Sequence, residues 1–176
     1  MESIINSIIK LFSGLTALKF GKELIVFIIS ILPILELRGG LIAASLLNVS
    51  PLTGYIVSII GNTLPVPFIL LFINKILDWM GKSKIKWMNK LSKWLDKKAR
   101  KHKDSIEKYG YLGLTLFVGV PLPGTGAWTG TLAASILDMD FKRSILAVML
   151  GVILAGIIMG LASAGVFGAY GAIFAA

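Results

Sequence analysis

The chain has 176 residues, a net charge of +9 and no cysteine, and 56% of its residues are hydrophobic, with a mean hydropathy of +0.83. Its length allows one domain or two small halves, and the composition is too apolar for a water-soluble domain. The lack of cysteine excludes disulfides, thiolate metal sites and cysteine nucleophiles.

Three long stretches contain no charged residue, namely 39–74, 109–137 and 144–176. A membrane-spanning helix needs roughly 20 apolar residues, so each stretch is long enough to cross. The first residues show neither the basic region nor the cleavage site of a signal peptide. We therefore predict a single all-α integral membrane domain, in a prokaryotic cytoplasmic membrane.

The chain starts with a predicted amphipathic helix in residues 1–22. Its apolar residues recur at helical spacing, with Lys10 on the opposite side, which is typical of a helix at the membrane surface. These apolar residues are Ile4, Ile5, Ile8, Leu11 and Phe12.

Residues 24–77 form the first predicted half. An apolar run too short to cross the membrane ends near Pro33, and a second short run follows before a polar turn at 48–51. This pattern predicts a re-entrant hairpin over 24–47. A full span over 52–77 follows, and Asn62, Pro65 and Pro67 predict a kink in it.

Residues 82–108 contain more than half of the chain's 18 Lys and Arg residues. Apolar residues including Trp87 and Trp94 fall on one helical face, which predicts an interfacial helix on the cytoplasmic side, bound to anionic lipid headgroups. Nucleic-acid binding is the alternative for a basic tract, and the hydrophobicity of the chain argues against it. His102 lies among lysines without a second histidine, so we interpret it as a surface residue and predict no metal site.

The second predicted half covers residues 109–165, with a hairpin over 109–137, a span over 144–165 and an apolar tail over 166–176. A re-entrant hairpin leaves Lys142 and Arg143 on the same side as the basic segment, as the positive-inside rule favours. One crossing then separates the hairpins, so they enter from opposite faces. The predicted architecture is an inverted repeat whose two breaks meet near the centre of the membrane.

The same residues recur ninety positions apart without a gap. The first set is Leu32, Pro33, Gly40, Ala43, Ala44, Ser45, Leu47 and Gly61, and the second is Leu122, Pro123, Gly130, Ala133, Ala134, Ser135, Leu137 and Gly151. Duplicated breaks in corresponding hydrophobic segments point to a transporter binding site. Chance agreement in a chain rich in Ala, Leu and Gly is the alternative.

The first break contains the only charges placed well inside apolar sequence, Glu36 and Arg38. Each costs roughly 2.5–3.5 kcal/mol at mid-membrane, so they should pair or face a water-filled cavity. Residues two apart point to opposite sides of a helix, and Pro33 with Gly39 and Gly40 can supply the non-helical backbone that a direct pair requires. Arg38 is then a candidate anchor for an anionic headgroup, with Glu36 orienting it or carrying a coupling proton. A structural ion pair is the alternative.

The second break carries no charge. It offers backbone N–H groups at a predicted helix N-terminus and two hydroxyl groups, from Thr125 and Thr129, which suit an anion. Trp128 either lines a substrate pathway or packs against other side chains. Asn62 either donates a hydrogen bond to a hairpin or bonds to a backbone group of its own kinked helix. The residues expected to break the second hairpin are Pro121, Pro123, Gly124, Gly126 and Gly130.

Two motifs resemble those of the putative small multi-drug export protein family, from about Glu23 to residue 165. They are the segment from Leu35 to Gly40 and the segment from Pro121 to Gly130. The resemblance implies a distant relationship to the DedA and VTT membrane proteins, which have paired re-entrant hairpins and are associated with lipid movement. The hairpins of those proteins carry an acidic residue and arginines. Glu36 corresponds to the acidic residue, whereas residues 118–130 contain no arginine.

These features predict a transporter or flippase for an amphiphile with an anionic headgroup, in contact with membrane lipids and with proton coupling possible. Proton-coupled export of lipophilic cations is the alternative within transport, and a non-transporting scaffold is the alternative of another class. We expect no enzyme activity, cofactor or nucleic acid. Two spans enclose little space, which makes a homo-oligomer plausible.

Overall fold

The computed structural model describes residues 1–82, 88–90, 93, 103–122 and 124–163, and these residues form helices without any strand. They fall into two compact units, Met1–Pro65 with the chain from Val152 onward, and Val66–Gly151. Several predictions lie outside the described residues: Trp87, Trp94, His102, Pro123, most of the basic segment 82–108 and the tail 166–176.

Two helical stretches are long and apolar enough to cross a membrane, Pro51–Ile73 and Phe141–Leu161, and they fall at the predicted spans. The first consists of α4 (Pro51–Thr63) and the start of α5 (Pro65–Lys82). The two helices meet at Leu64, because the following proline has no N–H group to continue the helical ladder. Pro65 therefore lies at an interruption of this segment, whereas Pro67 lies inside α5.

The second candidate span is most of α9 (Phe141–Ser163), which starts earlier than the predicted residue 144. The carboxylate of Asp140 accepts a hydrogen bond from the backbone N–H of Arg143 at 3.0 Å. This side chain caps the first turn, so α9 begins before residue 144 and includes Lys142 and Arg143.

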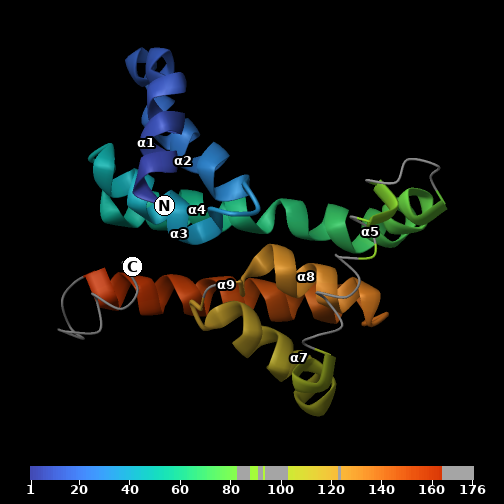
Figure 1. Cartoon of the computed structure of the whole chain (residues 1–176). Helices are drawn as coiled ribbons and strands as arrows, with labels where there is room; N and C mark the ends of the chain where they lie inside the picture. The colour runs from blue at the N-terminus through green and yellow to red at the C-terminus, as the bar shows by residue number, and fades with distance from the viewer. Residues whose placement is uncertain (83–87, 91–92, 94–102, 123, 164–176) are drawn as a thin grey trace. The chain divides into compact units, whose positions relative to one another are not determined.

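The first unit contains two short helices on either side of the first break. Helices α2 (Gly21–Ile31) and α3 (Glu36–Leu46) have 11 residues each. A helix of this length extends about 16 Å, against a hydrocarbon core of roughly 30 Å. They pack on each other and on α4 (Figure 1).

The N-terminal segment completes the first unit with α1 (Glu2–Leu11) and the 3-10 helix η1 (Ser13–Ala17). Ile5 of α1 is fully buried while most of its neighbours are exposed. Helix α1 ends at Leu11, whereas the predicted amphipathic helix covers residues 1–22. The apolar core of the unit consists of Ile5, Ile25, Val26, Ile29, Leu35, Ala43, Ala44 and Leu47.

The second unit contains α7 (Lys103–Gly119) and α8 (Ala127–Ile136), which pack together beside the first part of α9 (Figure 1). Gly110 adopts a non-helical conformation inside α7. The hydroxyl of Thr115 lies 3.0 Å from the Tyr111 carbonyl oxygen and 3.1 Å from that of Ala147, which ties α7 to α9.

The turns after α3 and α8 have the same geometry. Asn48 and Asp138 adopt left-handed backbone conformations, with φ of 53° and 51°. The N–H of the next residue returns to the carbonyl of Ala44 in one turn, at 2.9 Å, and of Ala134 in the other, at 3.0 Å. This is the Schellman motif, which satisfies carbonyls at a helix C-terminus.

Close helix packing also depends on glycine at the same places in both units. A Cβ atom on Gly61 would lie 2.8 Å from the carbonyl oxygen of Phe27, and one on Gly151 would lie 2.8 Å from that of Thr115. A second glycine in each unit approaches the same residue of α2 or α7. Ser30 is approached by Gly40 and Gly61, and Val118 by Gly130 and Gly151. Ser30 and Val118 therefore hold the same place in the packing.

Replacing either of these buried glycines by alanine should destabilise the protein. Gly61→Ala and Gly151→Ala each force a Cβ atom against a backbone carbonyl, so we expect each to lower the free energy of unfolding by about 1–3 kcal/mol. Gly160 on α9 has no atom within 4 Å of a Cβ position, so Gly160→Ala is the matched control and should be neutral or stabilising. Thermal unfolding in detergent measures the difference, and equal stability of all three variants would contradict the packing argument.

Candidate functional site

The first break consists of four residues between α2 and α3, and Glu36 follows it directly. The backbone N–H of Glu36 donates to the carbonyl of Leu32 at 2.9 Å. Glu36 has a φ of 50° and only 8% of its surface is exposed. Residues other than glycine rarely adopt this left-handed conformation, and such strain concentrates at functional sites.

The corresponding position of the second break, ninety residues on, holds Gly126 with a φ of 144°. Glycine adopts positive φ without a Cβ penalty, whereas an L-residue in the left-handed region pays roughly 1–2 kcal/mol. The first break therefore carries a buried carboxylate at a position where its counterpart has glycine.

Arg38 is half-buried, and its charge interacts with that of Glu36. The non-helical backbone that lets the two charges interact comes from Glu36 itself. The prediction that Gly39 and Gly40 interrupt the helix is wrong, because both lie inside α3. A Cβ atom on Gly40 would overlap the hydroxyl oxygens of Ser30 and Ser58, so this glycine serves close packing.

Three buried polar side chains lie on the helices that pack against α3, Ser30 on α2 and Ser58 and Asn62 on α4. The Ser30 hydroxyl donates to the Val26 carbonyl at 2.8 Å. Within the described part of the chain, Ser58 Oγ and Asn62 Oδ1 have no hydrogen-bond partner. Buried polar atoms are nearly always satisfied, so two such oxygens need an explanation.

The sequence predicted Asn62 as a site residue but missed Ser30 and Ser58. These two serines stand out only when the two halves are compared in the structure, where the packing of the helices is known. Val118 occupies the place of Ser30, and Val148 stands ninety residues after Ser58. Both valines are buried, so the interior is polar in the first half where it is apolar in the second.

In the second break, Thr125 holds the loop together. Its hydroxyl lies 2.9 Å from the carbonyl oxygen of Val120 and 2.8 Å from that of Leu122. Gly124, with a φ of 84°, and the buried Pro121 also shape this loop. Trp128 and Thr129 are half-buried on the first turn of α8. The prediction that Gly130 breaks the hairpin is wrong, because it lies inside α8.

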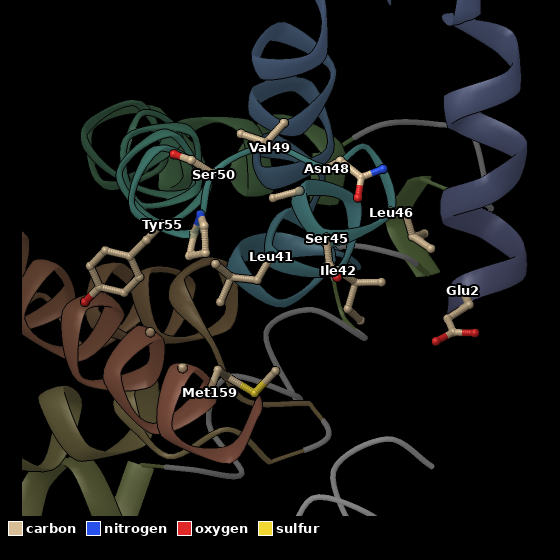
Figure 2. Close-up of a pocket in the computed structure, with 14 residues that line it drawn as sticks. Glu2, Leu41, Ile42, Ser45, Leu46, Asn48, Val49, Ser50, Tyr55 and Met159 are labelled. Atoms are coloured by element: carbon tan, nitrogen blue, oxygen red, sulfur yellow. The ribbon is translucent and has the colours of Figure 1, made fainter. Parts of the chain in front are cut away.

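A cavity of about 730 Å³ lies in the first unit, at the C-terminal end of α3. Figure 2 shows its lining, which comes from α3, the turn at Asn48, the start of α4 and the last turns of α9. The lining is mainly apolar, and Glu2 and Ser45 add polar atoms. The Tyr55 hydroxyl at its edge donates to the Ile153 carbonyl at 3.1 Å. The sequence did not predict this cavity, because α1 and α9 contribute to it from opposite ends of the chain.

A family model described as "Putative small multi-drug export protein" matches residues 36–158. The chain belongs to this family. The match starts at Glu36, directly after the first break, and includes the second break and most of α9. No curated protein and no solved structure matches the chain. The family description and the two candidate spans together indicate a membrane transporter rather than an enzyme.

The strain at Glu36 can be tested by comparing two substitutions that both remove the carboxylate. Glu36→Gly relieves the positive φ and Glu36→Ala does not, so we expect the glycine variant to be more stable by about 1 kcal/mol. Gly126→Ala is the matched reverse change and should destabilise the second break. Unfolding in detergent measures all three. Equal stability of the glycine and alanine variants at position 36 would show that the backbone there is unstrained.

Proposed function

We propose that this member of the family moves an amphiphile with an anionic headgroup across the membrane, and that the first break binds the headgroup. One observation carries the proposal: within a pair of interacting charges, Glu36 is buried and Arg38 is the more accessible member. Ionisable residues inside membrane segments are costly and usually functional. The accessible charge is the positive one, which selects an anion.

Arg38 has the geometry for this role, because its planar guanidinium group binds phosphate or carboxylate through two parallel hydrogen bonds. Glu36 orients the guanidinium group or carries a coupling proton. Gly39 and Gly40 allow α3 to pack closely behind the pair.

The cavity in the first unit supports an amphiphilic substrate. Its volume of about 730 Å³ falls within the range of small-molecule sites, roughly 300–1,000 Å³. From Glu36 to Ser45, α3 advances about 13 Å. A molecule with its headgroup at Arg38 and its apolar body in the cavity would therefore extend along α3.

The proposed architecture is an inverted repeat of two re-entrant hairpins, each followed by a span. Helices α2, α3 and α8 are too short to cross, and the same turn and glycine contacts occur in both units. Repeats of this kind with interrupted helices are typical of secondary transporters. The basic segment 82–108 then lies on the cytoplasmic face.

The family description favours a second candidate, export of lipophilic cations. In that case Glu36 exchanges its proton for the cation. A non-transporting scaffold is the outcome if neither class of substrate moves.

A transport assay separates these functions. In liposomes, we expect Arg38→Ala to slow the movement of a fluorescent lipid phosphate by about tenfold or more, the loss for a charge-assisted hydrogen bond. A neutral lipid with the same chains should be unaffected. Arg143→Ala is the matched control, because this arginine lies on the ring of Tyr111 outside the break. Loss of cationic dye efflux in Glu36→Gln, with lipid phosphate transport unchanged, would favour the second candidate.

The inverted arrangement predicts that the two hairpin turns face opposite sides of the membrane. Asn48→Cys and Asp138→Cys are a matched pair, because both positions are exposed and share the same backbone conformation. The chain has no other cysteine. A membrane-impermeant thiol reagent should label one variant from outside intact cells and the other only after permeabilisation. Labelling of both from the same face would rule out the inverted repeat.

A further inference from the structure

The packing of α3 on α4 follows one antiparallel register. A position four residues closer to the N-terminus of α3 contacts a position four residues closer to the C-terminus of α4. The close pairs are Ala44 with Gly54, where a Cβ on the glycine would lie 2.6 Å from the alanine Cβ, and Gly40 with Ser58, where it would lie 2.5 Å from the hydroxyl oxygen. One further turn along each helix leads from Gly40 to position 36 and from Ser58 to Asn62, so a continuation of this register would place Glu36 beside Asn62.

Oxygen atoms dominate this part of the first unit. The Ser30 hydroxyl donates its proton to Val26 and so presents lone pairs to its surroundings. Ser58 Oγ and Asn62 Oδ1 have no hydrogen-bond partner among the described residues, and both side chains are at least 98% buried. Buried oxygens such as those of Ser58 and Asn62 are unfavourable without a partner unless a proton or a cation lies beside them. Glu36, one turn before Gly40 in α3, has a carboxylate whose charge also interacts with that of Arg38.

We propose that Glu36, Ser30, Ser58 and Asn62 form a binding site for a sodium ion. Hard cations bind carboxylate, amide and hydroxyl oxygens. The carboxylate of Glu36 interacts with Arg38, and a monovalent cation would take the place of that positive charge. The described residues contain no group of three acidic, histidine or cysteine side chains for a multivalent metal. The two hydroxyls lie tightly against Gly40, which favours a small cation over potassium.

The second half lacks these oxygens. Val118 replaces Ser30 in the packing, and Val148 and Val152 stand ninety residues after Ser58 and Asn62. The proposal therefore assigns the ion to the first half alone.

The effect of this ion on transport rests on the proposed function. A sodium ion at Glu36 balances the carboxylate, so the positive charge of Arg38 is available to the anionic headgroup. Binding of the ion and of the headgroup then strengthen each other, and such linkage is reciprocal. The ion site itself can be tested without any substrate.

The experiment measures thermal unfolding of the purified full-length protein in lipid nanodiscs, in chloride salts of sodium, potassium and choline at equal ionic strength. A ligand that binds only the folded state raises the unfolding temperature with its concentration. We expect sodium to do so, and potassium and choline to do so less or not at all. Ser58→Ala and Asn62→Val should each weaken the apparent sodium affinity by about tenfold or more, the loss for one ligand.

Ser144→Ala is the matched control. Ser144 is also a fully buried serine whose hydroxyl has no hydrogen-bond partner in the described part of the chain, and it lies in the second unit. It should keep the sodium response. Radioactive sodium binding to the same samples gives a second readout, and circular dichroism verifies that each variant is folded.

Three outcomes would overturn the site. The three cations have equal effects, stability responds to pH but to no cation, or the sodium response survives in both Ser58→Ala and Asn62→Val. The proposed function is tested separately in liposomes. Lipid phosphate transport without sodium binding would reject the ion site alone, and sodium binding without transport would reject the proposed function alone.

Discussion

A helix that stops inside an apolar segment must satisfy its backbone groups within the protein, because lipid offers no hydrogen bonds. The two breaks meet this constraint differently. In the first, the N–H groups of Leu35 and Glu36 return to the carbonyl of Leu32, and Glu36 takes up the reversal of the chain in a left-handed conformation. In the second, the hydroxyl of Thr125 bonds the loop and glycines take the positive φ. The chemistry available at each break follows from these two solutions.

The all-helical class and the two candidate spans were predictable, because apolar length and the positions of proline and glycine determine where helices run and stop. The sequence was less informative about glycine. Gly40 and Gly130 looked like helix breakers, yet they lie inside helices where other helices approach closely. The same residue type serves turns and packing, and only the neighbours distinguish the two. The helices before the breaks are also offset, since Ser30 precedes Gly40 by fewer residues than Val118 precedes Gly130.

The sequence identified those site residues whose polarity differs from that of their neighbours along the chain. Glu36 and Arg38 are charges in apolar sequence, and Asn62 is an amide in a span. Ser30 and Ser58 conflict with nothing nearby, because a serine in a membrane helix can bond to its own backbone. Their proximity arises only when α2, α3 and α4 converge on Gly40. The cavity beside Tyr55 likewise needs segments that are distant in sequence.

The second half serves as an internal control for the first. It achieves the same close approach of three helices, with glycines in the same places, around Val118. The polar groups of Ser30, Ser58 and Asn62 are therefore not required for this packing. Apolar residues would satisfy it without leaving the oxygens of Ser58 and Asn62 unbonded, and glycine at position 36 would avoid the strain that Glu36 carries. The strain at Glu36 and the unbonded oxygens of Ser58 and Asn62 lie together in the first half, at positions where the second half has glycine and valine. Unfavourable features gathered in this way are the pattern expected of a binding site.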